Sequence, residues 1–318
     1  MAPQSSGPEH TPLIEAPKSK LPAIIGGLVA LVVVIGLVVF FTTRGGDDTA
    51  ADGTKLTKVT VGIVDSGDAY WKTYQEEARK QGIEIVYKKF SDYDQPNPAL
   101  SQGEVDVNEF QHIIFLAAYN VKNHDDLVPL GSTATYPLGL YSTKYTSVDD
   151  IKDGETVVVP DDDTNQARAL VLLQSKGLIK LKDGGTPFST IADVDESASR
   201  VKVKALKADL TPTSLQDVAA AIINNDFVED AGLKFSDAIA TDDPSDPKAL
   251  PYVNIFAVRA EDKDNPTYQK LVEIYQDSKA VQAGADEASG HTAQFVKIPQ
   301  AELQKSLEQT EKQVEAAQ

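Results

Sequence analysis

Short apolar segments alternate with helical segments along most of this chain, and this alternation constrains the fold more than any other feature. Residues 59–64 read as a strand, and a helical pattern follows to Lys80 and ends at Gly82. Residues 156–160 are almost wholly apolar, as expected for a strand of a parallel sheet covered on both faces. The pattern predicts an α/β fold with largely parallel strands. By itself it does not require more than one compact sheet.

The size and charge of the chain narrow the classes of function. At 318 residues it is long enough for about two domains of ordinary size. It contains no cysteine, which excludes disulfides, thiolate metal sites and thiol nucleophiles. Its net charge of −18 disfavours nucleic acid as a partner, because binding to phosphates needs a basic surface. An acidic domain on the outer side of a membrane fits this charge.

An uncharged segment near the N-terminus predicts a membrane span. As a helix, Leu21–Phe41 would span about 30 Å, one bilayer core, and it is too long for the apolar region of a cleavable signal peptide. Lys18 and Lys20 precede it, which favours a cytoplasmic N-terminus. We expect a disordered cytoplasmic tail (1–20), a single-pass signal anchor in the plasma membrane, and a flexible linker (42–55) leading to a domain on the extracytoplasmic face.

The segment FSDYDQPNPALSQGEVDVNEFQHIIFL combines aromatic rings, an imidazole and amide side chains beside the ends of expected strands. Ligands of open α/β sheets bind at the carboxyl ends of strands, and rings with a few amides suit a small zwitterion with an apolar tail. The residues concerned are Phe90, Tyr93, Asn97, Asn108, Phe110, His112 and Phe115. Asn108 is expected to cap the helix that follows it. Alternatively, Phe110, Phe115 and Leu116 form one face of that helix in a core, and His112 is a hydrogen-bonded core histidine.

A second candidate site lies at the start of an expected helix, in the sequence DTNQAR. Thr164 or Asp163 can cap this helix, whose first turn then carries Arg168. A helix N-terminus attracts anions, and an arginine adds a two-pronged donor that matches a carboxylate. The alternative is a surface salt bridge between Arg168 and Asp161 or Asp162, which would contribute little.

Two further asparagines stand where a ligand-facing amide is expected. Asn224 ends an apolar strand, at a position where a loop facing a ligand belongs. Asn254 lies within an otherwise apolar strand. A buried amide needs hydrogen-bond partners, which a ligand or a backbone group can supply.

Motifs for catalysis and metal binding are absent from the sequence. There is no Walker loop, no HExxH and no G-x-S-x-G. The histidines, at positions 10, 112, 124 and 291, are scattered and lack the spacing of metal ligands. We therefore expect no cofactor, no metal and no enzymatic activity.

Several motifs, in order along the chain, resemble the methionine-binding lipoprotein family, the substrate-binding subunits of an ATP-driven methionine importer. They are FSDYxxPNxAL, GExDxNxFQHxxxL, PLGLYS, TNQARAL, IINNDF and YVNIFAVR. Their ordered set is specific, and the resemblance covers residues 59–299. The chain departs from the family at Ile114 and Phe115, where proline and tyrosine are usual, and at Phe227, where tyrosine is usual. It also lacks the cysteine that carries the family's lipid anchor.

This resemblance implies a two-lobed, periplasmic-binding-protein-like fold of type II, with a ligand cleft between the lobes. Lobe 1 would comprise residues 56–138 and 255–300, and lobe 2 residues 139–254. The chain would cross between them near Pro137 to Tyr141 and near Tyr252 to Phe256.

Residues 301–318 would follow the family domain as a polar helical extension. Leu303, Leu307 and Val314 give it only a thin apolar stripe, so we expect a solvated helix. A helix that binds a partner is the alternative.

The resemblance also implies a function. The protein would bind methionine or a close analogue by lobe closure and deliver it to an ABC permease and its ATPase subunit. The residues implied for the ligand site are Tyr93, Asn97, Asn108, Phe110, His112, Phe115, Asn165, Arg168, Asn224 and Asn254. Asn224 and Asn254 match family positions that hold the polar end of the amino acid. Two alternatives stay open: an enzyme, such as a dehydratase or transferase, on the same fold, and a binding protein for a different small amino acid or a dipeptide.

Overall fold

The computed structural model describes residues 55–64, 67–244 and 247–317. The predicted tail, the predicted span Leu21–Phe41 and all but one residue of the predicted linker lie outside the described residues. Within the described part of the chain, no helix is both long and apolar enough to cross a membrane.

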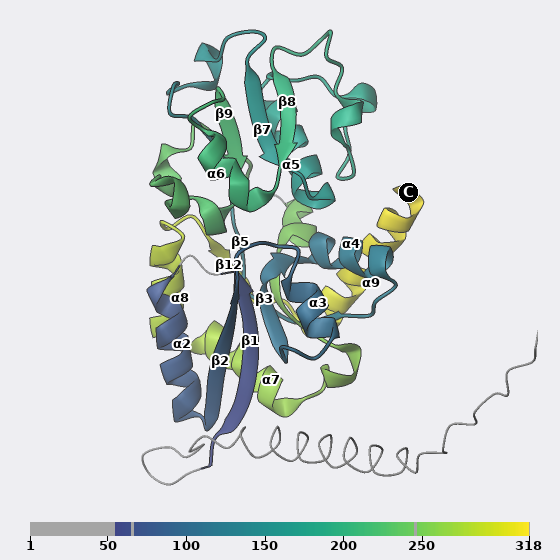
Figure 1. The fold of residues 1–318 in the computed structure, drawn as a ribbon. Coiled ribbons are helices and arrows are strands. Elements are labelled where there is room, and N and C mark those ends of the chain that lie inside the picture. The colour runs from purple at the N-terminus through teal and green to yellow at the C-terminus, as the bar shows by residue number, and fades with distance from the viewer. Residues whose placement is uncertain (1–54, 65–66, 245–246, 318) are drawn as a thin grey trace, which may run out of the picture. The chain divides into compact units, whose positions relative to one another are not determined.

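The first sheet has the strand order β2-β1-β3-β11-β4, and its strands β2, β1 and β3 are labelled in Figure 1. Its strands are β1 (Thr57–Val64), β2 (Ile83–Phe90), β3 (Val107–His112), β4 (Val128–Ser132) and β11 (Asn254–Val258). β2 and β3 lie parallel to β1 on either side of it, and β11 is inserted antiparallel between β3 and β4. The sheet is therefore built from two segments that are far apart in the chain.

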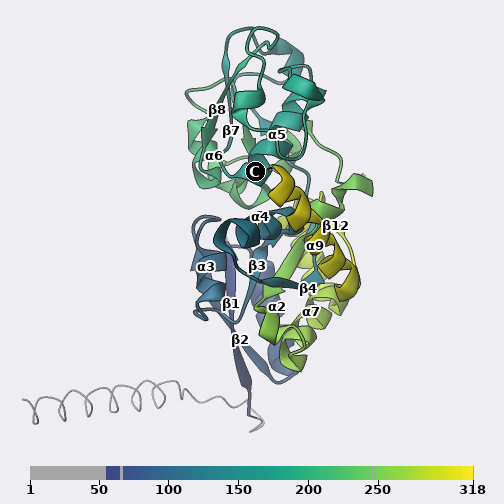
Figure 2. The ribbon, with the colours of Figure 1, turned by 90° about the vertical axis from the view of Figure 1, so that its right-hand side faces the viewer.

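Helices cover both faces of this sheet. One face carries α2 (Ala69–Lys80), α7 (Pro266–Asp277) and α8 (Lys279–Ala288), and the other carries α3 (Pro96–Ser101), α4 (Ile113–Asn123) and α9 (Gln300–Ala317) (Figure 1, Figure 2). The first face is packed with rings, since the buried ring of Tyr74 meets Phe256 and Tyr275 at centre distances of 6.1 and 5.6 Å. We call this sheet and its helices lobe 1.

The second sheet has the strand order β10-β6-β9-β7-β8. Its strands are β6 (Gly139–Tyr141), β7 (Thr156–Pro160), β8 (Lys202–Leu206), β9 (Ala220–Ile223) and β10 (Ala240–Thr241), and its helices are α5 (Asp163–Ser175) and α6 (Thr211–Ser214). Val157 and Val159 of β7 are buried in one cluster with Leu170 and Leu173 of α5. We call this sheet and its helices lobe 2. A separate two-stranded sheet joins β5 (Ala134–Thr135) to β12 (Gln294–Phe295).

The prediction of largely parallel strands is wrong for the strands that enter each sheet from the other lobe. β7 is parallel to β8 and β9, but β6 is antiparallel to β9 and β10, and β11 is antiparallel to β3 and β4. The first residue of each entering strand lies beside the last residue of its neighbour, as in the pairs Asn254–His112 and Gly139–Ile223. Because the chain enters these strands at the end where β3 and β9 finish, it must run in the opposite direction.

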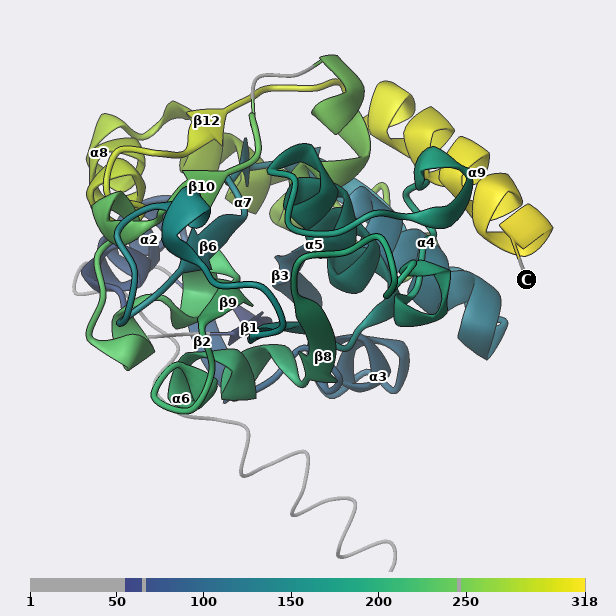
Figure 3. The ribbon, with the colours of Figure 1, turned by 90° about the horizontal axis from the view of Figure 1, so that it is seen from above.

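The C-terminal helix α9 is part of the core, so the expectation of a solvated helix is wrong. It lies along α4 (Figure 2, Figure 3). Leu303, Leu307 and Val314 are buried in the cluster that holds α4, and Asn120 of α4 donates a hydrogen bond to Glu311 (2.8 Å). A stripe of a few apolar residues is enough here, because only one narrow face of α9 meets the lobe.

Replacing Leu307 with alanine is expected to lower the free energy of unfolding by about 2–5 kcal/mol, because this side chain is only 1% exposed and its loss leaves a cavity. Gln313→Ala, on the exposed side of α9, is the matched control and should change it by less than about 0.5 kcal/mol. Urea unfolding measures both variants. Equal effects would contradict a core role for α9.

Candidate ligand-binding site

The ends of three strands converge on one small cleft between the lobes. His112 is the last residue of β3, Asn224 follows β9, and Asn165 lies in the first turn of α5, which follows β7. The cleft is lined by Tyr93, Phe110, Gln111, His112, Phe115, Tyr136, Asn165, Arg168, Asn224, Asn225, Tyr252 and Asn254. Its free space is about 20 Å³, little more than one water molecule needs, so its walls are closed on each other.

Three rings predicted to form a cage lie against one another on the lobe 1 wall. The centre of Tyr93 is 5.9 Å from Phe110 and 6.1 Å from Phe115, and the last two are 5.7 Å apart. Phe227 of lobe 2 adds a contact to Tyr93 at 5.1 Å. The Tyr93 hydroxyl donates a hydrogen bond to Asp226 (2.7 Å), which joins the two lobes.

His112 caps helix α4, and its imidazole is neutral. Its Nδ1 accepts a hydrogen bond from the Phe115 N–H (3.2 Å), so the proton lies on Nε2, which donates to Oδ1 of Asn165 across the cleft (3.2 Å). Burial, and then the nearby Arg168 guanidinium, lower the pKa of His112 to about 3. The prediction that Asn108 caps this helix is wrong, because β3 continues through Asn108 to His112.

Hydrogen bonds from Asp162 through Asn165 to Asn224 leave one acceptor without a partner. Helix α5 is capped by Asp162, which accepts a hydrogen bond from the Asn165 N–H (2.9 Å). The prediction that Thr164 or Asp163 caps it is therefore wrong. The Asn165 side-chain amide also donates to Asp162 (3.1 Å), so its Oδ1 accepts from His112 and from Nδ2 of Asn224 (3.0 Å). The buried Oδ1 of Asn224 then has no hydrogen-bond donor among the described residues.

Arg168 is held by groups from the chain segments that connect the lobes. Its Nε donates to Asp242 (2.6 Å), its Nη2 donates to the carbonyl of Tyr136 (2.8 Å), and its guanidinium lies 4.7 Å from the centre of the Tyr252 ring. The side chain is only 9% exposed. The alternative of a surface salt bridge with the aspartates before α5 is therefore wrong, because Arg168 is buried and pairs with a distant residue.

The structure does not bring Asn97 and Asn108 to the cleft. Asn108 donates to Asn97 (2.9 Å), and Asn97 and Gln111 exchange hydrogen bonds of 2.7 and 2.6 Å. These buried amides satisfy one another and fasten α3 to β3. Their placement does not support the prediction that Asn97 and Asn108 contact a ligand.

Four residues that line the cleft were not predicted: Gln111, Tyr136, Asn225 and Tyr252. Tyr252 lies in one predicted crossing, and Tyr136 directly precedes the other. A segment that connects two lobes necessarily borders the cleft between them. The position of these tyrosines was therefore the signal that could have identified them.

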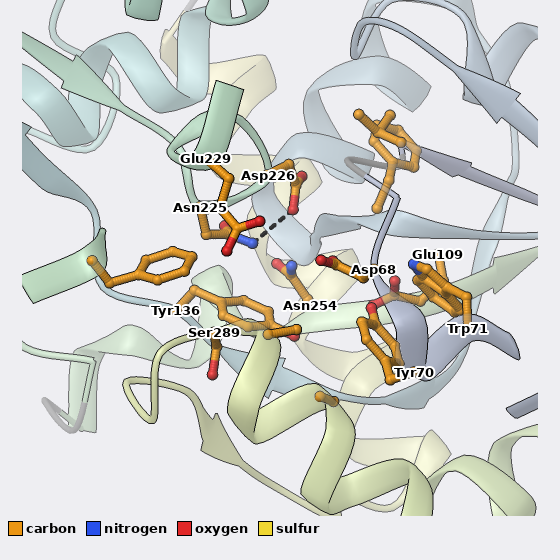
Figure 4. A pocket seen from close by; sticks show the side chains of 15 residues that line it. Asp68, Tyr70, Trp71, Glu109, Tyr136, Asn225, Asp226, Glu229, Asn254 and Ser289 are labelled. Carbon is orange, nitrogen blue, oxygen red and sulfur yellow. Dashed lines mark hydrogen bonds between the residues drawn. The ribbon is translucent and has the colours of Figure 1, made fainter. Parts of the chain in front are cut away.

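A second cavity, of about 30 Å³, adjoins the cleft and is rich in carboxyl groups (Figure 4). It shares Phe110, Tyr136, Asn225 and Asn254 with the cleft, and its carboxyl groups are those of Asp68, Glu109, Asp226 and Glu229. Burial raises the pKa of Glu109 to about 8 and that of Asp226 to about 7, although hydrogen bonds from Thr133 and Tyr93 partly oppose these shifts. Near neutral pH, the cavity is therefore less negative than its residues suggest.

The groups that line the cleft suit the binding of a small molecule. Across residues 55–64, 67–244 and 247–317, no group of three or more His, Cys, Asp or Glu side chains could hold a metal ion. The walls instead offer stacked rings, one buried guanidinium and an amide acceptor. Two α/β lobes around such a cleft define a periplasmic-binding-protein-like fold.

The chain belongs to the NlpA lipoprotein family, whose model matches residues 59–297. It is similar to the D-methionine-binding lipoprotein MetQ of Escherichia coli, with 40% identity over 207 residues, 64% of this chain and 75% of that protein. It is also similar to the solved substrate binding protein of a methionine transporter from Streptococcus pneumoniae (35% identity, TM-score 0.71, 75% of this chain and 95% of that chain). A nutrient binding protein from Burkholderia cenocepacia, bound to methionine, is similar too (36% identity, TM-score 0.69, 74% and 99%).

Replacing Glu109 with glutamine is expected to flatten the pH dependence of stability. A carboxyl group with a pKa raised from 4.5 to about 8 on folding binds its proton more tightly in the folded protein. Its contribution to stability is complete below about pH 4.5 and is lost as the pH rises through about 8. Glutamine keeps an acceptor for Thr133 and should remove this loss.

Urea unfolding at a series of pH values measures this effect. The parent should lose more stability than Glu109→Gln between about pH 5 and pH 8. Glu76→Gln, exposed on α2, is the control and should leave the slope unchanged. Parallel curves for the parent and Glu109→Gln would contradict the prediction.

Proposed function

We propose that this protein is the substrate-binding subunit of an ABC importer and that it binds methionine or a close analogue. The proposal is carried by one cleft that combines an aromatic wall, a buried guanidinium and an amide acceptor. These groups match the three parts of a free amino acid with an apolar tail. Family membership, and relatives named for methionine binding, support the same ligand and a binding rather than a catalytic role.

Each part of the ligand has a partner in the proposed complex. The rings of Tyr93, Phe110 and Phe115 contact the thioether tail, because sulfur and aromatic rings make favourable contacts. The carboxylate pairs with Arg168, and the ammonium group donates to Oδ1 of Asn224. The site is completed by His112, Asn165 and Asn254, while Asn97 and Asn108 support β3 from behind.

Ligand entry requires the lobes to separate, because the closed cleft has only about 20 Å³ of free space. We propose the type II arrangement, with residues 56–138 and 255–300 moving as one lobe and residues 139–254 as the other. The hydrogen bond from Tyr93 to Asp226 would break on opening and form again on closure. The closed, loaded form then docks on the permease, whose ATPase subunit drives transport.

We propose that an uncleaved span at Leu21–Phe41 anchors the protein in the plasma membrane, with the N-terminus in the cytoplasm. The absence of cysteine supports this, because the chain has no residue to carry the family's lipid. The intact protein should stay in the membrane fraction after high-salt washing, with its large domain accessible to external protease. Recovery of a soluble protein that starts beyond Phe41 would refute the uncleaved anchor.

The parent is expected to bind L-methionine in calorimetry, and Arg168→Ala to bind it about thirty-fold to a few thousand-fold more weakly. The reason is that truncating one partner of a buried charged pair costs about 2–5 kcal/mol. Arg168→Lys should recover only part of the affinity, because a lysine ammonium lacks the fork. Arg200→Ala removes an exposed ion pair with Asp153 in lobe 2 and should bind within about three-fold of the parent.

Failure of the folded parent to bind methionine, after any co-purified ligand has been removed, would refute the proposed function. Binding by folded Arg168→Ala within a few-fold of the parent would remove Arg168 from the site. Mass spectrometry of the ligand released from denatured, freshly purified protein would identify which amino acid or dipeptide the protein carries.

A further inference from the structure

We propose that Asp242 is a positioning residue that aims the Arg168 guanidinium at the ligand carboxylate and so makes the site selective for ligands with a free carboxylate. This inference rests on the proposed function, since it assumes that Arg168 meets the ligand. Asp242 itself lies outside the set of described residues that line the cleft, whereas Arg168 is among them. Any effect of Asp242 on binding must therefore pass through Arg168 or through the connection between the lobes.

Asp242 and the Tyr136 carbonyl accept hydrogen bonds from two nitrogens of the guanidinium. Oδ2 of Asp242 accepts from Nε of Arg168 (2.6 Å), and the carbonyl of Tyr136 accepts from Nη2 (2.8 Å). An arginine can offer a carboxylate either its side edge, Nε with Nη2, or its end edge, Nη1 with Nη2. Because Asp242 takes the Nε–H, the side edge is closed to a ligand carboxylate, and Nη1 together with the second N–H of Nη2 is left for the ligand.

The plane of the guanidinium is fixed as well as its edge. The Tyr252 ring lies 4.7 Å from the guanidinium carbon, and this contact restricts rotation out of the plane. Two hydrogen bonds to its nitrogens and a ring against its face hold the Arg168 guanidinium in one orientation before a ligand binds. Such preorganisation reduces the cost of ordering on binding.

Asp242 is itself fixed by the backbone between the lobes. Its Oδ1 accepts from the N–H of Leu138 (2.8 Å), and its own N–H donates to the carbonyl of Leu138 (3.2 Å). Both carboxylate oxygens are therefore used, one for the connecting segment and one for Arg168. Asparagine has one side-chain oxygen and can serve only one of these two donors.

The charge of Asp242 also matters. A guanidinium that is 9% exposed needs a partner, and Asp242, at 26% exposure, provides it when no ligand carboxylate is bound. A ligand with a carboxylate then joins an Arg–Asp pair that is already formed. A ligand with an amide in place of the carboxylate offers an NH₂ group and a single oxygen to the guanidinium. Its binding therefore gains little from the fixed orientation of Arg168.

The test compares the binding of L-methionine with that of L-methioninamide, in which an amide replaces the carboxylate. The pH is kept below the pKa of the methioninamide amino group, so that both ligands carry an ammonium group. Calorimetry measures the parent, Asp242→Ala, Asp242→Asn, Arg168→Ala and the double alanine variant. Asp242→Ala should weaken methionine binding by about ten- to a hundred-fold and methioninamide binding by less than about three-fold. The first range is the one found for residues that orient the side chains bound to a metal ion, a comparable positioning role. Asp242→Asn should fall between the parent and Asp242→Ala.

The double variant should bind methionine as weakly as Arg168→Ala alone, because Asp242 acts through Arg168. Asp153→Ala, which breaks the exposed pair with Arg200 in the same lobe, is the control and should leave both ligands unaffected. Thermal unfolding checks that each variant is folded. If Asp242→Ala is not folded, the comparison is made with Asp242→Asn alone.

Each of the following results would overturn the proposal. Equal weakening of methionine and methioninamide by the Asp242 variants would assign Asp242 only to the connection between the lobes. Additive losses in the double variant would show that Asp242 acts independently of Arg168. If the parent and the Asp242 variants discriminate equally well between the two ligands, the role of Asp242 is refuted while the proposed function stands. A parent that binds neither ligand would refute the proposed function and this role with it.

Discussion

The antiparallel insertion of β11 between β3 and β4 is the constraint on which the rest of the structure depends. It returns the chain from lobe 2 to lobe 1 and places Asn254 beside His112, at the ends of β3 and β11 that face the cleft. The entry of β6 beside β9 does the same for lobe 2. Because both crossings start or finish at this edge, the ends of β3, β7 and β9 must face one another, and the residues that follow them form one cleft.

The polar side of the cleft follows from a single carboxylate at a helix start. Asp162 caps α5 and also accepts from the Asn165 amide group, so the amide oxygen of Asn165 must point the other way. That oxygen takes hydrogen bonds from both His112 and Asn224. Asn224 donates one of its two amide N–H groups to Asn165, and its buried Oδ1 is left as an acceptor for whatever enters the cleft. The site thus presents an acceptor to a cation on one side and Arg168 to an anion on the other.

Local patterns in the sequence predicted the alternation of strands and helices and the main ring cluster, because periodicity and turn residues act over short distances. Tyr93, Phe110 and Phe115 lie together, as their common position beside strand ends suggested. The partners of Arg168 were missed, because Asp242 and Tyr136 lie 74 and 32 residues away and meet it only after the chain crosses between the lobes. Burial of α9 was missed for a similar reason, since nothing in that segment identifies α4 as its neighbour.

The distribution of groups over the two walls explains why a ligand would close the cleft. Among the described residues, the hydrogen bonds that cross it without a ligand include those from Tyr93 to Asp226, from His112 to Asn165 and from Arg168 to the Tyr136 carbonyl, and each contributes about 0.5–3 kcal/mol. The exposed pair of Lys207 and Asp94 adds little. A ligand bound to one wall alone would have no preference for the closed form. With the rings on lobe 1 and Arg168 and Asn224 on lobe 2, an amino acid bound as proposed would reach all of these groups only when the lobes are together, so its binding free energy would drive closure.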